Sequence, residues 1–350
     1  MHILNVMLGA GRGGIEQASL DYARALKGQG VSVLSVLAPG AAIAPAFERA
    51  GQAFATLRNF GPWDWLARRR LHHLWRQSGA ALALAHGNRA LSLLAHGPGR
   101  VVSVLHNYRL QHLKLADAAI GVTPALAARA VGAGLPSDRV LSLSNMLEII
   151  PPLAEPGVRQ PPVIGAFGRF VPKKGFAVFL DALALLRDRD VAFRARLGGG
   201  GDEEQALRTQ AAKLGLDTHL DWQGWVEDKA AFFRDLDVFC VPSLEEPFGI
   251  VMLEAFAHGV AVVAADAEGP QQIVGERGIA RLCRRGSPQA LADALQVLLA
   301  DAGLREGQRQ LAHAEVSARY AMPVVGARLA GWLATLPSAD RSNTTNPSAT

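Results

Sequence analysis

The sequence predicts an α/β protein made of two doubly wound units, each a parallel sheet covered by helices. Three observations lead to this prediction: a length of 350 residues, short apolar runs that alternate with helical stretches, and a proline-rich segment near the middle. A chain of this length suits two domains of ordinary size better than one small core. Alternation of strands with helices favours parallel pairing and a doubly wound sheet.

The first half begins as a strand, a helix and a second strand. The apolar runs HILNVML and VSVLSVLA flank the stretch IEQASLDYARALKGQG, whose apolar spacing is helical and which ends in glycine. These patterns predict buried strands around an amphipathic helix. Further apolar runs alternate with helical stretches at ALALAHG, RVVSVLH and AAIGVTP, and in the second half at VIGAFGRF, FRARLGGG, DVFCVP and VAVVAAD.

The boundary between the units is predicted near residue 150. The segment IIPPLAEPGVRQPPV contains five prolines, which remove backbone donors and favour extended chain. We therefore expect an N-terminal unit at 1–150, a linker at 151–162 and a C-terminal unit at 163–322. A helix at 323–336 is expected to pack back on the N-terminal unit, and the polar tail at 337–350 is expected to be disordered.

Composition indicates a soluble cytoplasmic protein. Hydrophobic residues make up 49% of the chain and charged residues 19%, and no apolar run approaches the roughly 20 residues of a membrane-spanning helix. The N-terminal apolar run has no cationic segment before it and no cleavage site after it, so we expect a strand and not a signal peptide. Cys240 and Cys283 stand far apart, which supports neither a disulfide framework nor a zinc site.

Positive charge is concentrated in the first half. Residues 1–150 contain fifteen Lys and Arg against seven Asp and Glu, whereas the remainder contains 21 against 24. Such a bias favours anionic partners such as acidic lipid head groups or phosphorylated acceptors, although a solvated basic surface explains it equally well. We expect no nucleic-acid partner, because no aromatic and basic reading surface is apparent.

The first strand ends in a glycine-rich turn. Gly9, Gly11 and Gly14 satisfy the pattern G-x-G-x-x-G, which places backbone amides and a helix N-terminus where they can receive a phosphate. A nicotinamide-dependent dehydrogenase would also need an acidic residue at the end of the second strand, and that strand ends in VLAPG. The dehydrogenase fingerprint is therefore incomplete; a tight turn and an anion site both remain open.

In the second half, cations follow the strand VIGAFGRF. Arg169 and Lys174 lie just beyond its carboxyl end, where open α/β sheets bind ligands. Two cations there can hold a diphosphate, although an exposed basic loop is the alternative. No Walker-type loop occurs, so ATP hydrolysis has little support.

The segment SLEEPFGIVMLEAFAHGV sets two carboxylates in an apolar stretch. We predict a loop that carries Glu246, a helix that begins near Phe248 or Gly249, and Glu254 about one turn inside it. Glu246 and the amides of Gly249 and Ile250 then converge on one ligand. Carboxylates accept strong hydrogen bonds from hydroxyls, so a polyhydroxyl ligand suits the site. A capping Glu246 and an ion-paired Glu254 are the structural alternative.

Together these motifs resemble the retaining, nucleotide-sugar-dependent glycosyltransferases of family 4, also called group 1. The resemblance is carried by Gly13-Gly14, GRF..KKG, GGGGDEEQAL, WQGWVEDK and VPSLEEPFGIVMLEAFAHGVAVVAAD, and it covers nearly all of residues 1–335. It implies the GT-B fold, in which two Rossmann-like domains face across a cleft. The N-terminal domain would then lie on the acceptor side, and the C-terminal domain would bind the nucleotide-sugar donor.

The resemblance also implies roles for individual residues. Arg169 and Lys174 would bind the donor diphosphate, Glu254 the ribose and Glu246 the sugar hydroxyls. His106 would contact the sugar and stabilise transition-state charge; a hydrogen-bonded core histidine is the alternative, and His86 is a weaker candidate. The remaining donor-site residues implied are Gly13, Gly14, Gly199, Asp202, Val226, Phe248, Gly249 and Ile250.

The implied reaction moves a sugar, from a UDP-sugar by preference, to a hydroxyl of a saccharide or a lipid-linked or lipopolysaccharide-type acceptor. Cations and a helix N-terminus stabilise the leaving diphosphate, so we expect no metal and no cofactor. The sequence departs from the family at Gln272, where relatives often have an acid. This departure keeps open a catalytically impaired nucleotide-sugar-binding protein.

The stretch GPWDWLARRRLHHLWRQ bears on the acceptor. Ala67, Leu71, Leu74 and Trp75 form a helical stripe, Trp63 and Trp65 are candidate interfacial anchors, and Arg68, Arg69, Arg70 and Arg76 supply positive charge. The pattern fits a helix that lies on an anionic membrane surface at the inner face of the cytoplasmic membrane. An ordinary helix docked on the sheet, with a basic outer face, is the alternative.

Overall fold

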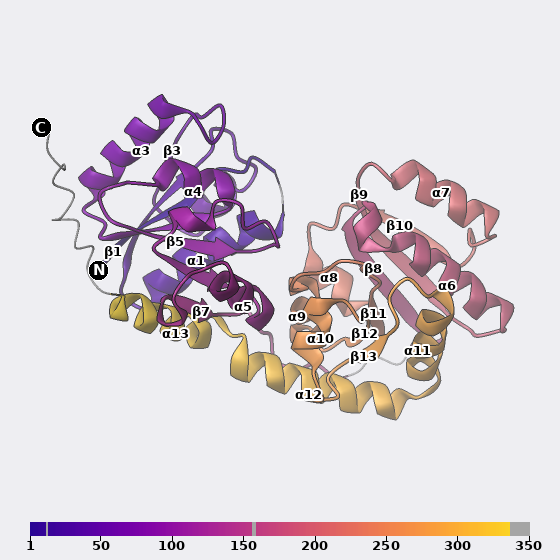
Figure 1. Ribbon diagram of the computed structural model, residues 1–350. Helices are drawn as coiled ribbons and strands as arrows, with labels where there is room; N and C mark the ends of the chain where they lie inside the picture. Colours follow the sequence, from indigo (N-terminus) through magenta and orange to yellow (C-terminus); the bar gives the residue numbers. More distant parts are fainter. Residues whose placement is uncertain (12, 156–158, 337–350) are drawn as a thin grey trace, which may run out of the picture. The chain divides into compact units, whose positions relative to one another are not determined.

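The computed structural model describes residues 1–11, 13–155 and 159–336, and within them it separates into two compact units. The N-terminal unit contains residues 1–146 and the chain from Met322 onward, and the C-terminal unit contains Leu147–Ala321. Each unit is an open parallel sheet with helices packed on it (Figure 1). This is the predicted fold class.

Within the described part of the N-terminal unit, seven parallel strands follow the order β3-β2-β1-β4-β5-β6-β7. The strands are β1 (His2–Met7), β2 (Ser32–Leu37), β3 (Phe54–Thr56), β4 (Leu82–His86), β5 (Arg100–Leu105), β6 (Ala118–Gly121) and β7 (Val140–Ser142). The helices are α1 (Gly14–Gly28), α2 (Ala44–Arg49), α3 (Trp65–Ser78), α4 (Asn88–Leu94), α5 (Pro124–Gly132) and α13 (Met322–Thr335), with short 3₁₀ turns at Leu113–Leu115 and Ser137–Arg139.

Strand β1 is apolar on both faces because both are covered. Leu4 and Val6 pack with α3 and α4 on one face, whereas Met7 packs with α1 and α2 on the other. Alternate side chains of a strand point to opposite faces, so Asn5 shares the α1 face with Met7. A continuous apolar run interrupted by one asparagine therefore marks a central strand with a polar contact under α1.

In the described part of the C-terminal unit, six parallel strands follow the order β10-β9-β8-β11-β12-β13. The strands are β8 (Val163–Arg169), β9 (Arg194–Gly200), β10 (Leu220–Gly224), β11 (Val238–Val241), β12 (Ala261–Ala265) and β13 (Arg281–Cys283). The helices are α6 (Phe176–Asp188), α7 (Glu204–Lys213), α8 (Lys229–Arg234), α9 (Ile250–Ala257), α10 (Glu268–Val274), α11 (Pro288–Ala300) and α12 (Ala302–Arg319), and Pro172–Lys174 is a 3₁₀ turn.

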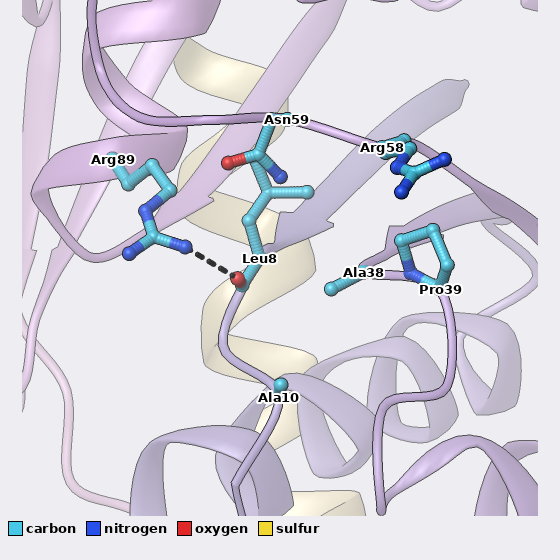
Figure 2. A pocket seen from close by; sticks show the side chains of 7 residues that line it. All are labelled: Leu8, Ala10, Ala38, Pro39, Arg58, Asn59 and Arg89. Atoms are coloured by element: carbon cyan, nitrogen blue, oxygen red, sulfur yellow. Dashed lines mark hydrogen bonds between the residues drawn. The ribbon is translucent and has the colours of Figure 1, made fainter.

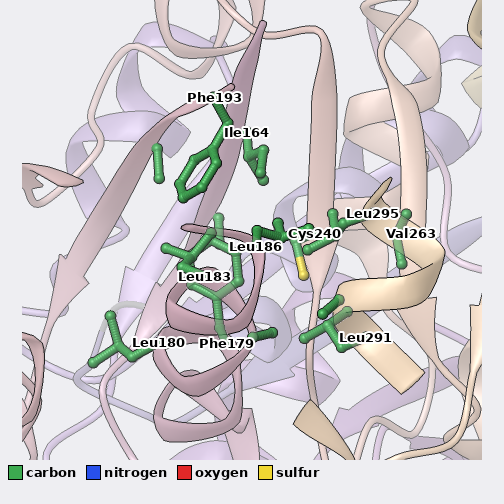
Figure 3. Packing of buried hydrophobic residues seen from close by; sticks show 14 of the residues in the cluster. Ile164, Phe179, Leu180, Leu183, Leu186, Phe193, Cys240, Val263, Leu291 and Leu295 are labelled. Carbon is green, nitrogen blue, oxygen red and sulfur yellow. The ribbon is translucent and has the colours of Figure 1, made fainter. Parts of the chain in front are cut away.

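Helices α6 and α11 form the main core of this unit against the sheet. Phe179, Leu183 and Leu186 of α6 pack with Leu291 and Leu295 of α11 (Figure 3). The same cluster reaches Ile164, Cys240 and Val263 on three neighbouring strands. Both cysteines are free and buried, and burial raises the pKa of the Cys283 thiol to about 11. Their role is core packing.

The unit boundary falls at Met146, four residues before the expected one. The segment that we interpreted as the start of a linker is held by α12: the His313 ring contacts the Pro151 carbonyl at 2.8 Å, and Arg309 donates to the Ala154 carbonyl. Residues 147–155 therefore belong to the C-terminal unit. Residues 156–158 of the expected linker and the expected tail at 337–350 lie outside the described residues.

The last helix returns to the N-terminal unit. Helix α13 packs on α1, and a Cβ at Gly326 would lie 3.2 Å from the side chain of Ala25. A glycine at this position lets the two helices approach closely. The chain thus passes from one unit to the other both after Met146 and after Ala321.

Candidate functional site

The paired cations and carboxylates of the C-terminal unit meet at the carboxyl end of its sheet. Lys174, in the turn after β8, lies 2.5 Å from Glu246, in the loop after β11. Glu246 is buried, and Lys174 is about three-quarters buried. An ion pair this shielded from water is stronger than a surface pair, but a carboxylate left without its lysine would carry a large desolvation penalty.

Gly175 brings the two loops together. It has a φ of 70°, and a Cβ there would lie 2.1 Å from the Pro242 carbonyl oxygen. The amides of Leu244 and Glu245 donate to the Lys173 carbonyl at 2.8 and 3.1 Å. The turn KKG is therefore fastened to the loop SLEE by backbone contacts, which places Lys174 beside Glu246.

Helix α9 begins beside this ion pair. Gly249 precedes it with a φ of 93°, and the structure confirms that Glu254 lies one turn inside the helix. A Cβ at Gly269 would lie 2.4 Å from the Phe248 carbonyl oxygen, and the Gly269 amide donates to the Glu246 carbonyl at 2.8 Å. The start of α10 thus holds the segment 246–249, while the first amides of α9 lie at the positive end of its helix dipole.

Glu254 has a partner that the sequence analysis missed. Lys229, at the start of α8, lies 2.5 Å from one carboxylate oxygen of Glu254. The other oxygen, Oε2, is buried and has no hydrogen-bond partner among the described residues. The ion-paired alternative for Glu254 is therefore present in the structure, yet one of its oxygens remains free to accept. The motif VEDK contains Lys229, but nothing in its pattern indicates which acid this lysine contacts.

A run of glycines packs β8 against β9. A Cβ at Gly199 would lie 1.9 Å from the Gly168 carbonyl oxygen, and one at Gly198 would lie 2.3 Å from the side chain of Val226. Val226 therefore lies beside Gly198, the residue before Gly199. Asp202 is exposed at the start of the following turn.

Arg169 is the last residue of β8 and is exposed. It forms no ion pair with any residue that the structure describes. Gln272 of α10 has a buried side-chain oxygen that lacks a hydrogen-bond partner within the described chain. Among the described residues of the C-terminal unit, the Arg169 guanidinium has no ion-pair partner, and Glu254 and Gln272 each have a buried oxygen without a hydrogen-bond partner.

In the N-terminal unit, the glycine-rich turn already lies against a carboxylate. A Cβ at Gly9 would lie 2.5 Å from one oxygen of Glu16, and a Cβ at Gly13 2.9 Å from the other. Gly13 precedes α1 in extended conformation, and Gly14 is exposed with open space around its Cα. An anion at this turn would require the Glu16 side chain to move.

His106 belongs to a hydrogen-bonded chain. Its Nε2 lies 3.0 Å from Nδ1 of His86, and Nε2 of His86 lies 2.9 Å from Oδ1 of Asn5. Burial lowers the pKa of His106 to about 4; burial and then the neighbouring ring of His106 lower the pKa of His86 well below its usual range. Both rings are therefore neutral at physiological pH. Asn5 was missed by the sequence analysis, although a lone amide in an apolar strand is a signal of such a contact.

A cavity of about 430 Å³, lined by both apolar and polar residues, lies at the carboxyl end of the N-terminal sheet. Figure 2 shows Arg89 and Arg58 on opposite sides of it, with Asn59 between them. Arg89 contacts the Leu8 carbonyl at 3.4 Å, and Oδ1 of Asn59 is buried without a hydrogen-bond partner within the described residues. A second cavity of about 430 Å³ shares Arg58 and is lined by Arg70 and His73 of α3.

Helix α3 docks on the sheet through its apolar stripe. Ala67, Leu71 and Trp75 are buried, and the indole of Trp75 donates to the Ala80 carbonyl at 2.8 Å. The preceding loop and first turn leave large apolar side chains in solvent: Phe60, Trp63, Trp65 and Leu66 are 86%, 82%, 61% and 49% exposed. The helix is therefore docked on the sheet while these four side chains remain exposed.

None of the helices within the described residues is long and apolar enough to cross a membrane. No group of three or more His, Cys, Asp or Glu side chains among them is arranged to hold a metal ion.

The chain is similar to a known protein family, to several curated proteins and to solved structures. A family model described as "Glycosyl transferases group 1" matches residues 154–314. The phosphatidyl-myo-inositol mannosyltransferase of Mycobacterium tuberculosis (strain ATCC 25618 / H37Rv) is 31% identical over 91% of this chain and 92% of its own length. The lipopolysaccharide core biosynthesis glycosyltransferase LpsE of Rhizobium meliloti (strain 1021) is 28% identical over 89% of this chain and 93% of its own.

Among solved structures, Anabaena Alr3699/HepE in complex with UDP and glucose superposes with a TM-score of 0.84 at 22% identity. The match covers 96% of this chain and all of that one. Likeness at this level of identity concerns the fold, and the fold shared is GT-B.

Proposed function

The chain belongs to the group 1 glycosyltransferases, and on that premise we propose that it is a retaining enzyme that uses a UDP-sugar and a saccharide or lipopolysaccharide-type acceptor. The observation that carries the proposal is the Lys174–Glu246 pair beside the start of α9. It supplies a cation for a diphosphate and an acceptor for sugar hydroxyls within one shielded site. A relative named for lipopolysaccharide core biosynthesis and one named as a phosphatidyl-myo-inositol mannosyltransferase support the class of acceptor.

Donor binding would exchange partners in this site. The diphosphate takes Lys174 and the free Arg169, and hydroxyls of the sugar donate to the released Glu246. The amides at the start of α9 face the same negative charge, and the bare Oε2 of Glu254 accepts from the ribose. Lys174 and Glu246 each exchange one partner for another, so separating them on donor binding costs little free energy.

The same groups act on the reaction. Departure of the diphosphate develops negative charge on its oxygens, and preorganised cations and amides stabilise that charge more in the transition state than in the ground state. Gly199, Asp202 and Val226 would border the base. Gly13 and Gly14 would serve the donor from the N-terminal unit once Glu16 turns aside. No metal is required by this scheme.

The acceptor is assigned to the N-terminal unit. Its cavity between Arg58 and Arg89 combines two cations with an Asn59 oxygen that no described residue contacts by a hydrogen bond. Such a set suits a hydroxylated ligand that carries phosphate or carboxylate. Phe60, Trp63, Trp65 and Leu66 would insert at the surface of an anionic membrane, and Arg68, Arg69, Arg70 and Arg76 would add attraction. We place the enzyme in the cytoplasm, at the inner face of that membrane.

A donor panel tests the proposal. Melting temperatures are measured with UDP-, GDP- and ADP-sugars. Sugars of one nucleotide should raise the melting temperature, because a ligand that binds only the folded state stabilises it. Hydrolysis or transfer from that donor should persist in excess EDTA. A protein that binds no nucleotide sugar would contradict the proposal.

A nucleotide-sugar-binding protein without activity is the second candidate, and Gln272 is the observation that favours it. Its test is Gln272→Glu. Tight donor binding with no turnover in the wild type, and turnover in Gln272→Glu, would establish this alternative.

A further inference from the structure

Three residues that are far apart in the sequence form a directed chain of hydrogen bonds in the N-terminal unit. Asn5 lies in β1, His86 ends β4, and His106 follows β5. Their side chains are joined at 2.9 Å between Asn5 and His86 and at 3.0 Å between His86 and His106. Which ring nitrogens carry protons follows from the first member of the chain.

The amide of Asn5 can face only one way. Its Nδ2 donates to the Ser19 carbonyl at 2.9 Å and to the Ser35 hydroxyl at 3.2 Å. A backbone carbonyl accepts but never donates, so the nitrogen must lie on this side and Oδ1 must face His86. That oxygen also only accepts, which places a proton on Nε2 of His86.

The tautomer of His86 in turn determines which nitrogen of His106 carries a proton. The His86 ring is buried against the edge of Tyr22, with centroids 5.3 Å apart, and burial keeps it neutral. A neutral imidazole with its proton on Nε2 has a bare Nδ1. Nδ1 can therefore only accept, and the proton between the two rings belongs to Nε2 of His106.

We propose that Asn5 and His86 are positioning residues that hold His106 with its proton on Nε2, leaving Nδ1 bare to accept a hydrogen bond from a substrate hydroxyl. The ring so held offers a lone pair and no positive charge, in contrast to the charge-stabilising role that the family resemblance implied. Substrate contact by His106 rests on the proposed function, whereas the direction of the chain does not.

Histidine-selective ¹⁵N labelling and long-range ¹H–¹⁵N spectra at neutral pH report which nitrogen carries the proton. The protein contains its own references: Nε2 of His72 faces the Leu93 carbonyl at 3.1 Å, and Nδ1 of His258 faces the Glu254 carbonyl at 2.8 Å. His106, assigned by loss of its signals in His106→Gln, should match His72. A match to His258, or two protonated nitrogens, would overturn the proposal.

Asn5→Asp should reverse the chain. A carboxylate at this position favours an imidazolium at His86, whose Nδ1–H then donates to Nε2 of His106. The proton of His106 moves to Nδ1, and its signals come to resemble those of His258. If Asn5→Asp is folded and His106 keeps its proton on Nε2, Asn5 does not set the direction.

His86→Leu provides a second test should Asn5→Asp fail to fold. Without an acceptor at Nε2, His106 should populate both tautomers; one unchanged tautomer would overturn the role of His86. With the donor and acceptor found by the panel, kcat/KM should fall about tenfold, the effect of one misaligned hydrogen bond. Absence of transfer in the wild type contradicts only the proposed function, because the spectra are read without substrate.

Discussion

Both units bring polar side chains from separate strands and loops into contact, but these side chains are charged in one unit and neutral in the other. In the C-terminal unit, Lys174 pairs with Glu246 and Lys229 with Glu254. In the N-terminal unit, His106, His86 and Asn5 form a chain of neutral groups. Ion pairs can exchange partners with a charged ligand, whereas a neutral chain is fixed by which atoms donate. The first arrangement suits capture of a diphosphate, and the second suits orientation of a hydroxyl.

The two states also differ in how they are built. The charged site is built from local sequence motifs. Gly175 and Gly269 let the turn after β8 and the start of α10 approach the loop after β11 closely. The hydrogen bonds of the neutral chain depend on strand order and register, because β1 pairs with β4 and β4 pairs with β5. Changes to single loops should therefore damage the first, and changes of protonation the second.

Lys174→Met should give the largest effect. Loss of a preorganised cation at the leaving group is expected to lower kcat about 10³-fold, and it leaves Glu246 buried without its partner. Lys173→Met is the matched control, because Lys173 is exposed and only its carbonyl is used. Steady-state kinetics with the donor identified by the panel measure both. Equal losses of kcat in the two variants would show that Lys174 does not act on the leaving group.

Gly175→Ala tests the loop contact. Gly175 and Gly30 have similar φ values, 70° and 73°, but a Cβ at Gly30 meets nothing within 4 Å. We expect Gly30→Ala to lower the free energy of unfolding by about 1 kcal/mol through backbone strain alone, and Gly175→Ala to lower it by about 4 kcal/mol. Urea denaturation compares them. Similar losses would mean that the approach to Pro242 is relaxed without cost.

Acid should weaken the neutral chain. The pKa of His106 is about 4 when folded against an ordinary 6.5, so between these values the unfolded chain binds more protons. The associated stability is complete above pH 6.5 and is lost as the pH falls toward 4, by an amount on the order of 3 kcal/mol. Urea denaturation of wild type and His106→Gln at several pH values isolates this part. A slope unchanged in the variant would mean that His106 does not remain neutral.

The smallest effects should tell the two units apart. Thr123 caps α5 by accepting from the Leu126 amide, and Ser287 caps α11 by accepting from the Ala290 amide, both at 3.2 Å. Thr123→Ala and Ser287→Ala should each cost about 1 kcal/mol. In calorimetry the first should shift unfolding of the N-terminal unit and the second that of the C-terminal unit. If both shift one common transition, the units unfold together.

Several features of the site were accessible from the sequence because they depend on neighbours along the chain. The start of α9, the place of Glu254 within it and the strands around the motifs follow from local periodicity and from glycine. The resemblance to group 1 glycosyltransferases rests on the same local motifs, and the family match lies at residues 154–314.

The sequence by itself determined the apolar strands, because local apolar runs mark them, but it did not mark β3, β7, β10 and β13. Only the tertiary structure decided that Lys229 reaches Glu254, that Glu16 lies against Gly9 and Gly13, and that Asn5 directs two histidines. Ion pairs and hydrogen bonds between distant segments depend on strand order and register to within an ångström, and short-range patterns carry no information at that scale. Partners across the fold are therefore fixed by packing, even where the residues themselves are evident.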